Sequence, residues 1–551
     1  MGWSARRIYE RRNCAADCSR RRERASHVAT TTAGIRPRRG LPHPESFHAG
    51  NPRWTETARH VLVPRGGGYS YGAGSLSEFD GNNLAHRGDV VVVSITHRLN
   101  ILGHLDLAGI GGEEYADSAN VGILDIRAAL QWVRENIERF GGDSGNVLTF
   151  GQSGGGDKGA LCAMPSAKGL FHKAAVQSGS TFQTLLHDAS TKIAESLLMK
   201  VGLRANQLHD LQNLAYDRLL SATIAAPGER PLRFGPVVDG RILPGRPFDP
   251  TAPEASAEVP MIIGTTATEI TYMIGAMDPA VFHLSEADMR MRLKKIAGDS
   301  SDGLIDLYRK NRPEGSPSDI FFAITTDRQM RRSAILQAER KAGVGKASAY
   351  MYLMAWKTPA EDGKWRSPHT VEVPFVWDNV NESASLVGRC PELGSLADKM
   401  SGAWLAFAHT GSPSTPGLRW PSYTASQRAT MIFDNRCEVV NDPDKKERLA
   451  IEMSTAPLVR NGLSRLECPA REQHFYARRC SPVNSYYRNV WSAVKLQTKN
   501  RDDGFGLRQC IRPLVESKTP GHDGFLPALF LFSQTVPLCH LKSPPADMAG
   551  P

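Results

Sequence analysis

The 551-residue sequence predicts an α/β fold with a mostly parallel central sheet flanked by helices. Three observations predict it: a run of valines over 90–93, a periodic apolar segment over 124–140, and an apolar run over 147–150. A strand, a helix and a second strand with short connections form the unit from which parallel sheets are built. The composition, 41% hydrophobic and 23% charged, is typical of a globular protein with a large core.

The elements follow in order. Residues 61–63 predict a first strand, and a run of three glycines comes shortly after it. The four consecutive valines within 89–95 predict a strand that is buried on both faces. Over 124–140 the apolar residues recur every three or four positions, which predicts one buried helix face, and the glycines at 141 and 142 end it.

Ser153 lies in the segment Gly151-Gln152-Ser153-Gly154-Gly155, directly after the strand at 147–150 and before an expected helix at 157–164. A serine nucleophile needs a sharp turn between a strand and a helix, and the glycines around it let other backbone come close. The pentapeptide alone is a weak signal in a glycine-rich chain. A near match, Gly142-Asp143-Ser144-Gly145, is better interpreted as a polar turn. The strand before Ser153 favours it as the nucleophile of an ester hydrolase.

A serine hydrolase also needs backbone N–H groups that stabilise the negative charge on the attacked carbonyl oxygen. The N–H of Gly154 follows the serine directly, and Gly67 and Gly68 lie in the earlier glycine run. In isolation three glycines indicate only a flexible loop. Their place after a strand and before the strand–helix–strand unit favours an oxyanion hole.

These segments and several others resemble the type-B carboxylesterase family, which includes bacterial para-nitrobenzyl esterases and cholinesterases. The resemblance runs from about residue 66 to 453 and also rests on residues 120–125, 128–133, 136–143, 169–172 and 177–179. It implies the α/β-hydrolase fold, a Ser-His-Glu triad, a small-molecule ester substrate, and no metal or organic cofactor.

The resemblance implies that Glu269 is the acid of the triad. It ends the segment 259–269, which is similar to a family segment reading Gly-Thr-x-x-x-Glu after a strand. The residues alone do not distinguish Glu269 from Asp239, Asp278 or Glu286.

The resemblance likewise implies that His369 is the base, because 369–376 is similar to the family stretch in which a histidine precedes Glu-x-Pro-Phe-Val. His369 would take the proton of Ser153 and later deliver it to the leaving alkoxide. His409 matches a family segment that is not catalytic.

The sequence divides into a basic segment over 1–60, a hydrolase domain over 61–453, and a C-terminal tail of uncertain structure over 454–551. The arginine-rich segment before the glycine run does not resemble the family, so we expect it to be disordered or aberrant and the N-terminal strands to be missing. Arg65 stands where relatives usually carry histidine or an aromatic residue.

Other function classes are disfavoured. The net charge of +10 is concentrated in the first forty residues, and no base-reading motif accompanies it, so no specific nucleic acid is expected. Nine cysteines without CxxC pairs predict neither a metal site nor a disulfide framework. The N-terminus lacks an apolar signal segment, and the apolar stretch 525–536 is too short and polar to span a membrane, so a cytoplasmic location is expected.

Three functional hypotheses follow. The first is a carboxylic-ester hydrolase that acts through an acyl-enzyme. The second is a truncated, impaired or non-enzymatic binding relative, and the third is a lipase on the same fold. Candidate walls of the substrate pocket are the aromatic residues Tyr69, Tyr71, Phe182 and Trp377.

Overall fold

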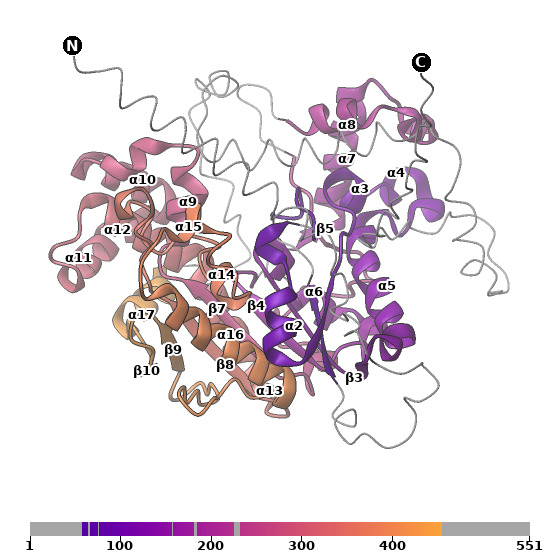
Figure 1. The fold of residues 1–551 in the computed structure, drawn as a ribbon. Helices are drawn as coiled ribbons and strands as arrows, with labels where there is room; N and C mark the ends of the chain where they lie inside the picture. The colour runs from indigo at the N-terminus through magenta and orange to yellow at the C-terminus, as the bar shows by residue number, and fades with distance from the viewer. Residues whose placement is uncertain are drawn as a thin grey trace, which may run out of the picture. The chain divides into compact units, whose positions relative to one another are not determined.

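The computed structural model describes residues 58–63, 67–74, 76–156, 158–180, 184–224 and 232–454. Within them an eight-stranded sheet has the order β10-β9-β8-β7-β4-β3-β1-β2, and all its neighbours pair in parallel except β9 and β10 (Figure 1). The predicted, mostly parallel sheet is therefore confirmed. Its strands are β1 (Ala58–Val63), β2 (Val90–Ser94), β3 (Gly142–Gln152), β4 (Lys173–Gln177), β7 (Met261–Thr266), β8 (Ala349–Met354), β9 (Ala429–Phe433) and β10 (Glu438–Asn441), with a separate pair of β5 (Leu185–Leu186) and β6 (Val237–Val238).

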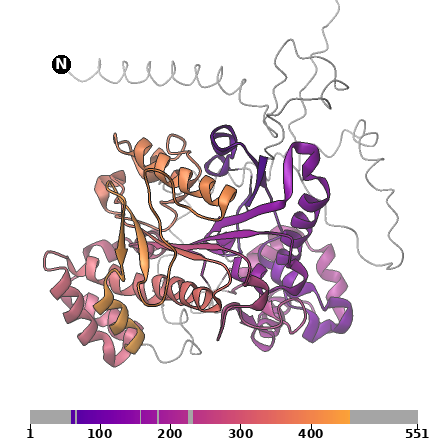
Figure 2. The same ribbon diagram turned by 90° about the horizontal axis from the view of Figure 1, so that it is seen from below.

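Helices cover both faces of this sheet, as Figure 2 shows. On β3, Leu148 and Phe150 belong to one apolar cluster with α14 (Val373–Val376) and α16 (Leu393–Thr410). Val147 belongs to the cluster on the opposite face, with α5 (Val121–Asn136), α6 (Lys158–Ala163) and α13 (Arg332–Val344). Alternate side chains of a strand point to opposite faces, so a central strand covered on both sides reads as a continuous apolar run.

The prediction for the valine strand is wrong in one respect. β2 lies at the end of the sheet and pairs, among the described strands, with β1. Val90 is buried, whereas Val91, Val92 and Val93 are half-buried, because this strand has a paired neighbour on one side alone among the described strands. The helix α2 (Asn82–Gly88) packs near it. A run of valines therefore indicated a parallel strand correctly but not its burial on both faces.

Two further helical groups lie on either side of the sheet in Figure 1. One has its own apolar core and contains α9 (Glu269–Gly275), α10 (Glu286–Ala297), α11 (Ser301–Asn311) and α12 (Pro317–Thr326). The other contains α3 (Asn100–His104), α4 (Ala108–Gly111), α7 (His187–Val201) and α8 (Tyr216–Thr223). The remaining helices are α15 (Ala384–Val387) and α17 (Lys445–Ser454).

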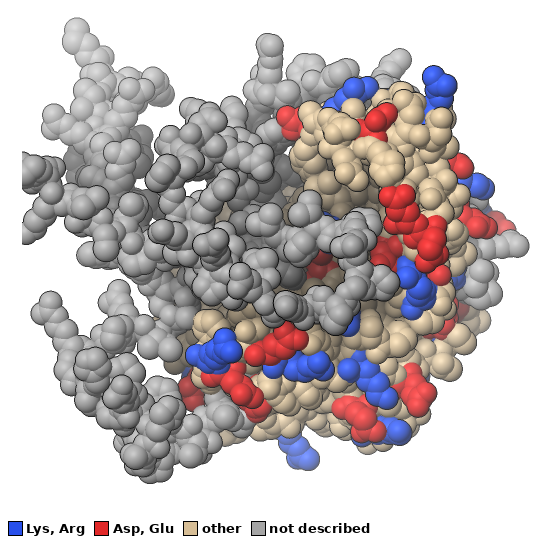
Figure 3. Space-filling model, turned by 90° about the vertical axis from the view of Figure 1, so that its right-hand side faces the viewer, with Lys and Arg blue, Asp and Glu red and all other residues tan. Residues whose placement is uncertain are grey.

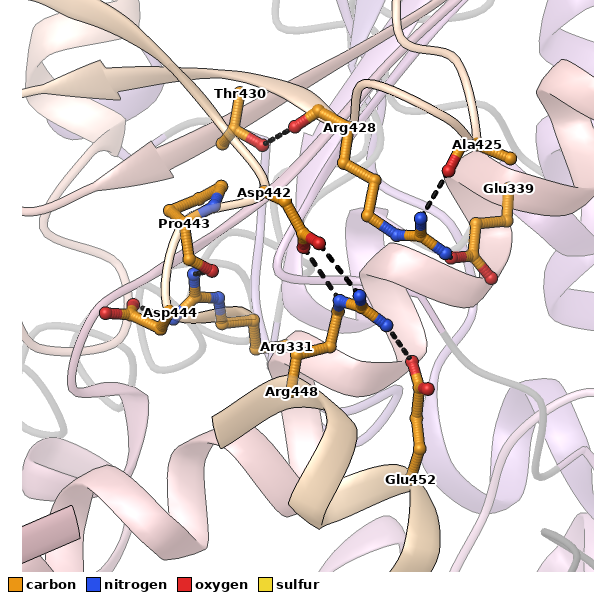
Figure 4. A network of polar contacts seen from close by, with 10 residues as sticks. All are labelled: Arg331, Glu339, Ala425, Arg428, Thr430, Asp442, Pro443, Asp444, Arg448 and Glu452. Atoms are coloured by element: carbon orange, nitrogen blue, oxygen red, sulfur yellow. Dashed lines mark hydrogen bonds and ion pairs between the residues drawn. The ribbon is translucent and has the colours of Figure 1, made fainter. Parts of the chain in front are cut away.

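Ion pairs link α17 and the segment before it to the rest of the fold (Figure 4). Arg448 on this helix donates to both carboxylate oxygens of Asp442, at 2.8 and 2.9 Å, and to Glu452 at 2.8 Å. Beside it, Arg331 donates to Asp444 at 2.7 Å. These arginine side chains are almost fully buried, so little water solvates their positive charges. The paired carboxylates compensate for that lost hydration.

The predicted element boundaries shift by a few residues. The helix predicted at 124–140 is α5 followed by one 3₁₀ turn, Ile137–Phe140, and Gly141 ends it with a φ of 78°. The first described strand starts at Ala58, within the segment predicted to be disordered. The basic N-terminal residues up to 57 and the tail from 455 lie outside the described residues.

On the face drawn in Figure 3, basic and acidic side chains of the described residues are mixed. No helix in the described part of the chain is long and apolar enough to cross a membrane. Within the same residues there is no group of three or more histidine, cysteine and acidic side chains that could hold a metal ion.

Candidate active site

Ser153 occupies a sharp turn at the carboxyl end of a central strand. β3 ends at Gln152, a 3₁₀ turn covers Ser153–Gly156, and α6 begins at Lys158. The φ of Ser153 is 56°, in the left-handed region that non-glycine residues rarely adopt. The strand-to-helix turn that the sequence predicts is therefore present, and strain of this kind is typical of nucleophiles at such turns.

The glycine loop lies against the residue after the serine. A Cβ added to Gly154 would be 2.7 Å from the backbone nitrogen of Tyr69 and 3.0 Å from that of Gly68. The backbones of the two segments therefore approach closely. Gly67 contributes a turn, because its carbonyl oxygen accepts from Ser70 N at 2.9 Å. The N–H of Tyr69 was not among the predicted oxyanion donors, and Arg65 lies outside the described residues.

Glu269 and His369 lie in direct contact. His369 Nδ1 is hydrogen-bonded to Glu269 Oε2, and Glu269 Oε1 accepts from Thr266 N at 2.9 Å. Glu269 is fully buried and His369 is 6% exposed. The other acids that the sequence left open bind elsewhere: Asp239 to Asn120, Asp278 to Arg292, and Glu286 to Arg290.

Gln152, which sequence analysis did not single out, joins the histidine to the serine turn. Its side-chain nitrogen lies 3.1 Å from His369 Nε2 and 3.4 Å from His369 Nδ1. With Nδ1–H donated to Glu269, Nε2 is the acceptor for the Gln152 amide. No hydrogen bond links Ser153 to His369 among the described residues, so the serine hydroxyl would have to replace the amide at Nε2. Catalytic hydrogen bonds often form fully only when substrate is bound.

A second buried carboxyl group, Glu372, lies three residues after the histidine and is fully buried. Burial and the neighbouring Glu269 carboxylate raise the pKa of Glu372 to about 8, and Ser178 Oγ lies 3.5 Å from its Oε1. At His369, burial opposes a charge, but the Glu269 carboxylate outweighs it and raises the pKa of the imidazole above its ordinary value. The site thus favours one carboxylate, one neutral carboxyl and an imidazole that readily accepts a proton.

The four aromatic residues predicted as pocket walls lie in different environments. Trp377 is a core residue, not a wall: it is 1% exposed and its ring packs against Phe79 and Phe150, with centroids 5.8 and 5.2 Å apart. Tyr69 lies beside Gly154, and Tyr71 is exposed. The remaining candidate, Phe182, falls outside the described residues.

The fold and the turn at Ser153 define the chain as an α/β-hydrolase. Comparison with known proteins then identifies its family. A model of the carboxylesterase family matches residues 51–451, so the chain belongs to that family, and the similarity begins before the predicted start at residue 66. The chain is a carboxylic-ester hydrolase.

Individual relatives agree. The chain is 35% identical to the para-nitrobenzyl esterase of Bacillus subtilis (strain 168) over 392 residues, which cover 70% of this chain and 77% of that protein. It is 29% identical to the phenmedipham hydrolase of Pseudarthrobacter oxydans over 409 residues, covering 72% and 79%. Among solved structures, the Geobacillus stearothermophilus carboxylesterase matches with a TM-score of 0.65 and 34% identity over 72% of this chain and 82% of that one.

Proposed function

We propose that the chain hydrolyses small-molecule carboxylic esters through an acyl-enzyme on Ser153, with His369 as general base and acid and Glu269 as the acid of the triad. The observation that carries the proposal is the contact chain from Glu269 through His369 to Gln152, the residue next to the serine. A nucleophile, a base and a group that orients the base in this order are the components of serine hydrolysis.

In the first step His369 Nε2 takes the proton of Ser153 as its oxygen attacks the ester carbonyl. The bond between the carbonyl carbon and the alkoxy oxygen breaks, and the imidazolium gives its proton to the leaving alkoxide. Water then attacks the acyl-enzyme with the same histidine as base, which releases the acid and restores the serine.

The N–H groups of Gly154, Gly67 and Gly68 are the proposed donors to the oxyanion, and Gly67 also shapes the turn of the glycine loop. Their close backbone approach supports this role, since preorganised N–H groups stabilise the developing charge by several kcal/mol, roughly 3–4 for one donor. The raised pKa of His369 supports its role as base, because the imidazole binds the serine proton more strongly.

The test is hydrolysis of 4-nitrophenyl acetate by the wild type and by Ser153→Ala, for which we expect a loss of kcat of at least about a thousandfold. The matched control is Ser144→Ala, because Ser144 lies in the near-match motif and is half-buried near the start of β3, with its hydroxyl bound to Glu138 at 3.2 Å. Hydrolysis that survives Ser153→Ala contradicts the mechanism. Wild-type protein that is folded but does not react with an organophosphate would support the impaired relative instead, and a preference for long acyl chains would support the lipase.

A further inference from the structure

A short segment before β6 lies beside the proposed oxyanion loop. A Cβ added to Gly235 would be 3.2 Å from Cδ2 of Tyr69, and the backbone nitrogen of Tyr69 faces Gly154. One tyrosine ring therefore separates Gly235 from the residue next to Ser153. The segment that carries Gly235 therefore lies close to the proposed oxyanion loop.

Contacts along this segment show which side chains face the loop. Leu232 and Phe234 both pack into the apolar cluster of α3, α7 and α8, whereas Gly235 meets Tyr69. Pro236 follows, and a residue before proline favours an extended backbone. Alternate residues of an extended chain point to opposite sides, so we expect Arg233 to lie on the same side of the segment as Gly235, toward Tyr69. Its side chain is exposed.

The guanidinium of Arg233 has no carboxylate partner among the described residues. Within the described residues no hydrogen bond or ion pair involves it. Neighbouring protein atoms shield part of the guanidinium from water, which lowers the pKa of Arg233, while the rest of the side chain stays exposed. Asp239, in the same part of the chain, already accepts from Asn120 Nδ2 at 2.9 Å and from Leu243 N at 2.9 Å. An arginine remains charged under these conditions.

A second group packed on the ring of Tyr69 adds no negative charge. His104 lies edge-on to Tyr69, with ring centroids 5.6 Å apart. Burial lowers the pKa of His104 to about 4, so the imidazole is neutral at pH 7. A planar, unpaired guanidinium in such surroundings is suited to a carboxylate, which it binds through two parallel hydrogen bonds.

We propose that Arg233 binds a carboxylate group of the substrate, so that this hydrolase prefers esters that carry a free carboxylate within reach of the ester bond. The proposal rests on the function proposed above, because it assigns a substrate class to the site around Ser153. Arg233 would act on recognition and not on the bond-breaking step.

The kinetic experiment compares two substrates of the same acyl chain: the 4-nitrophenyl half ester of adipic acid, which is an anion, and its methyl-capped analogue, which is neutral. Release of nitrophenolate is followed after subtraction of the uncatalysed rate. We expect Arg233→Gln to lower kcat/KM about tenfold for the anion, equivalent to about 1.4 kcal/mol, and to leave the neutral ester unchanged. Arg233→Lys should retain part of the preference, and 0.5 M NaCl should weaken it.

The matched control is Arg419→Gln. Arg419 is also exposed, and the adjacent Trp420 packs against Trp404 of α16 and Phe433 of β9. An equal effect of Arg233→Gln on both esters, no effect on either, or the same effect of Arg419→Gln overturns the proposal.

A binding measurement separates this proposal from the proposed mechanism. Calorimetry with monomethyl adipate and the Ser153→Ala protein needs no turnover, so it gives an answer even if the wild type is inactive. We expect the affinity to fall about tenfold when Arg233→Gln is added, and dimethyl adipate to bind both proteins equally. Equal affinities of the two proteins for monomethyl adipate overturn the proposal.

Discussion

Glu269→Gln probes the contact on which the proposed triad depends. Glutamine has the shape of glutamate, and its oxygen can still accept from Thr266 N, where Glu269 Oε1 accepts at 2.9 Å. The other end changes, because an amide N–H now faces His369 Nδ1 where a carboxylate oxygen accepted. The imidazole would then carry its proton on Nε2 and could not take the proton of Ser153.

The size of the effect follows from the buried geometry. Glu269 is fully buried and His369 nearly so, so their attraction is weakly screened. Two unit charges about 4 Å apart interact by roughly 4 kcal/mol at an effective dielectric constant of about 20. Loss of that attraction for the imidazolium corresponds to about a thousandfold in rate, and the wrong tautomer can bring the loss to about ten-thousandfold.

The assay is kcat for 4-nitrophenyl acetate at pH 8, with thermal unfolding to confirm that the variant is folded. Glu286→Gln is the control, because Glu286 binds Arg290 and Arg309 on the helices α10 and α11, away from the site. A loss of less than about tenfold in Glu269→Gln would refute the assignment of Glu269 as the acid.

Three further variants test other parts of the structure. The pKa of Glu372 is about 8 in the folded protein and 4.5 ordinarily, so the folded state holds this proton more tightly than the unfolded state. The free energy of unfolding of the wild type should therefore fall as pH rises from 4.5 to 8. Urea titrations of Glu372→Gln should lack that fall. Gly67→Ala should reduce kcat at least tenfold, because the φ of Gly67 is 103° and the new Cβ would lie 2.0 Å from the carbonyl oxygen of Tyr71. The control is Gly202→Ala, where φ is 72° and the new Cβ would meet no atom within 4 Å. This variant should change stability but not kcat. Arg448→Met should lower the free energy of unfolding by about 2 kcal/mol in urea titrations, less than for a fully buried pair because its partners reach solvent, and an unchanged midpoint would contradict the role given to this ion pair.

The sheet could be predicted because its strands are short and apolar and alternate with helices. The turn at Ser153 could be predicted from glycines that follow such a strand. The valine strand was placed correctly but its burial was not, since edge or centre depends on which strands pair, and the valines do not encode that. Neither Gln152 nor Glu372 could be recognised from its neighbours in the sequence. Gln152 matters through its contact with a histidine more than two hundred residues away, and Glu372 matters through its burial.

Trp377 is a second residue whose role could not be predicted from the sequence. An aromatic residue shortly after the proposed base is compatible with a pocket or with the core, and only packing against Phe150 decides for the core. The choice of Glu269 over the other acids came from the resemblance, and the residues themselves gave no reason to prefer it. Local patterns predict elements, whereas the pairing of distant side chains depends on the folded topology.

The separation of the site residues along the chain has a consequence for folding. Glu269 and His369 are 100 positions apart, and Gln152 and His369 are 217 apart, so each contact closes a long loop. Such loops form late, because their entropy is lost before the contact can stabilise the chain. Ester hydrolysis should therefore return only when β3, β7 and β8 lie side by side in register. In a refolding experiment, enzymatic activity would report the completion of the central sheet, after helix content measured by circular dichroism has already recovered.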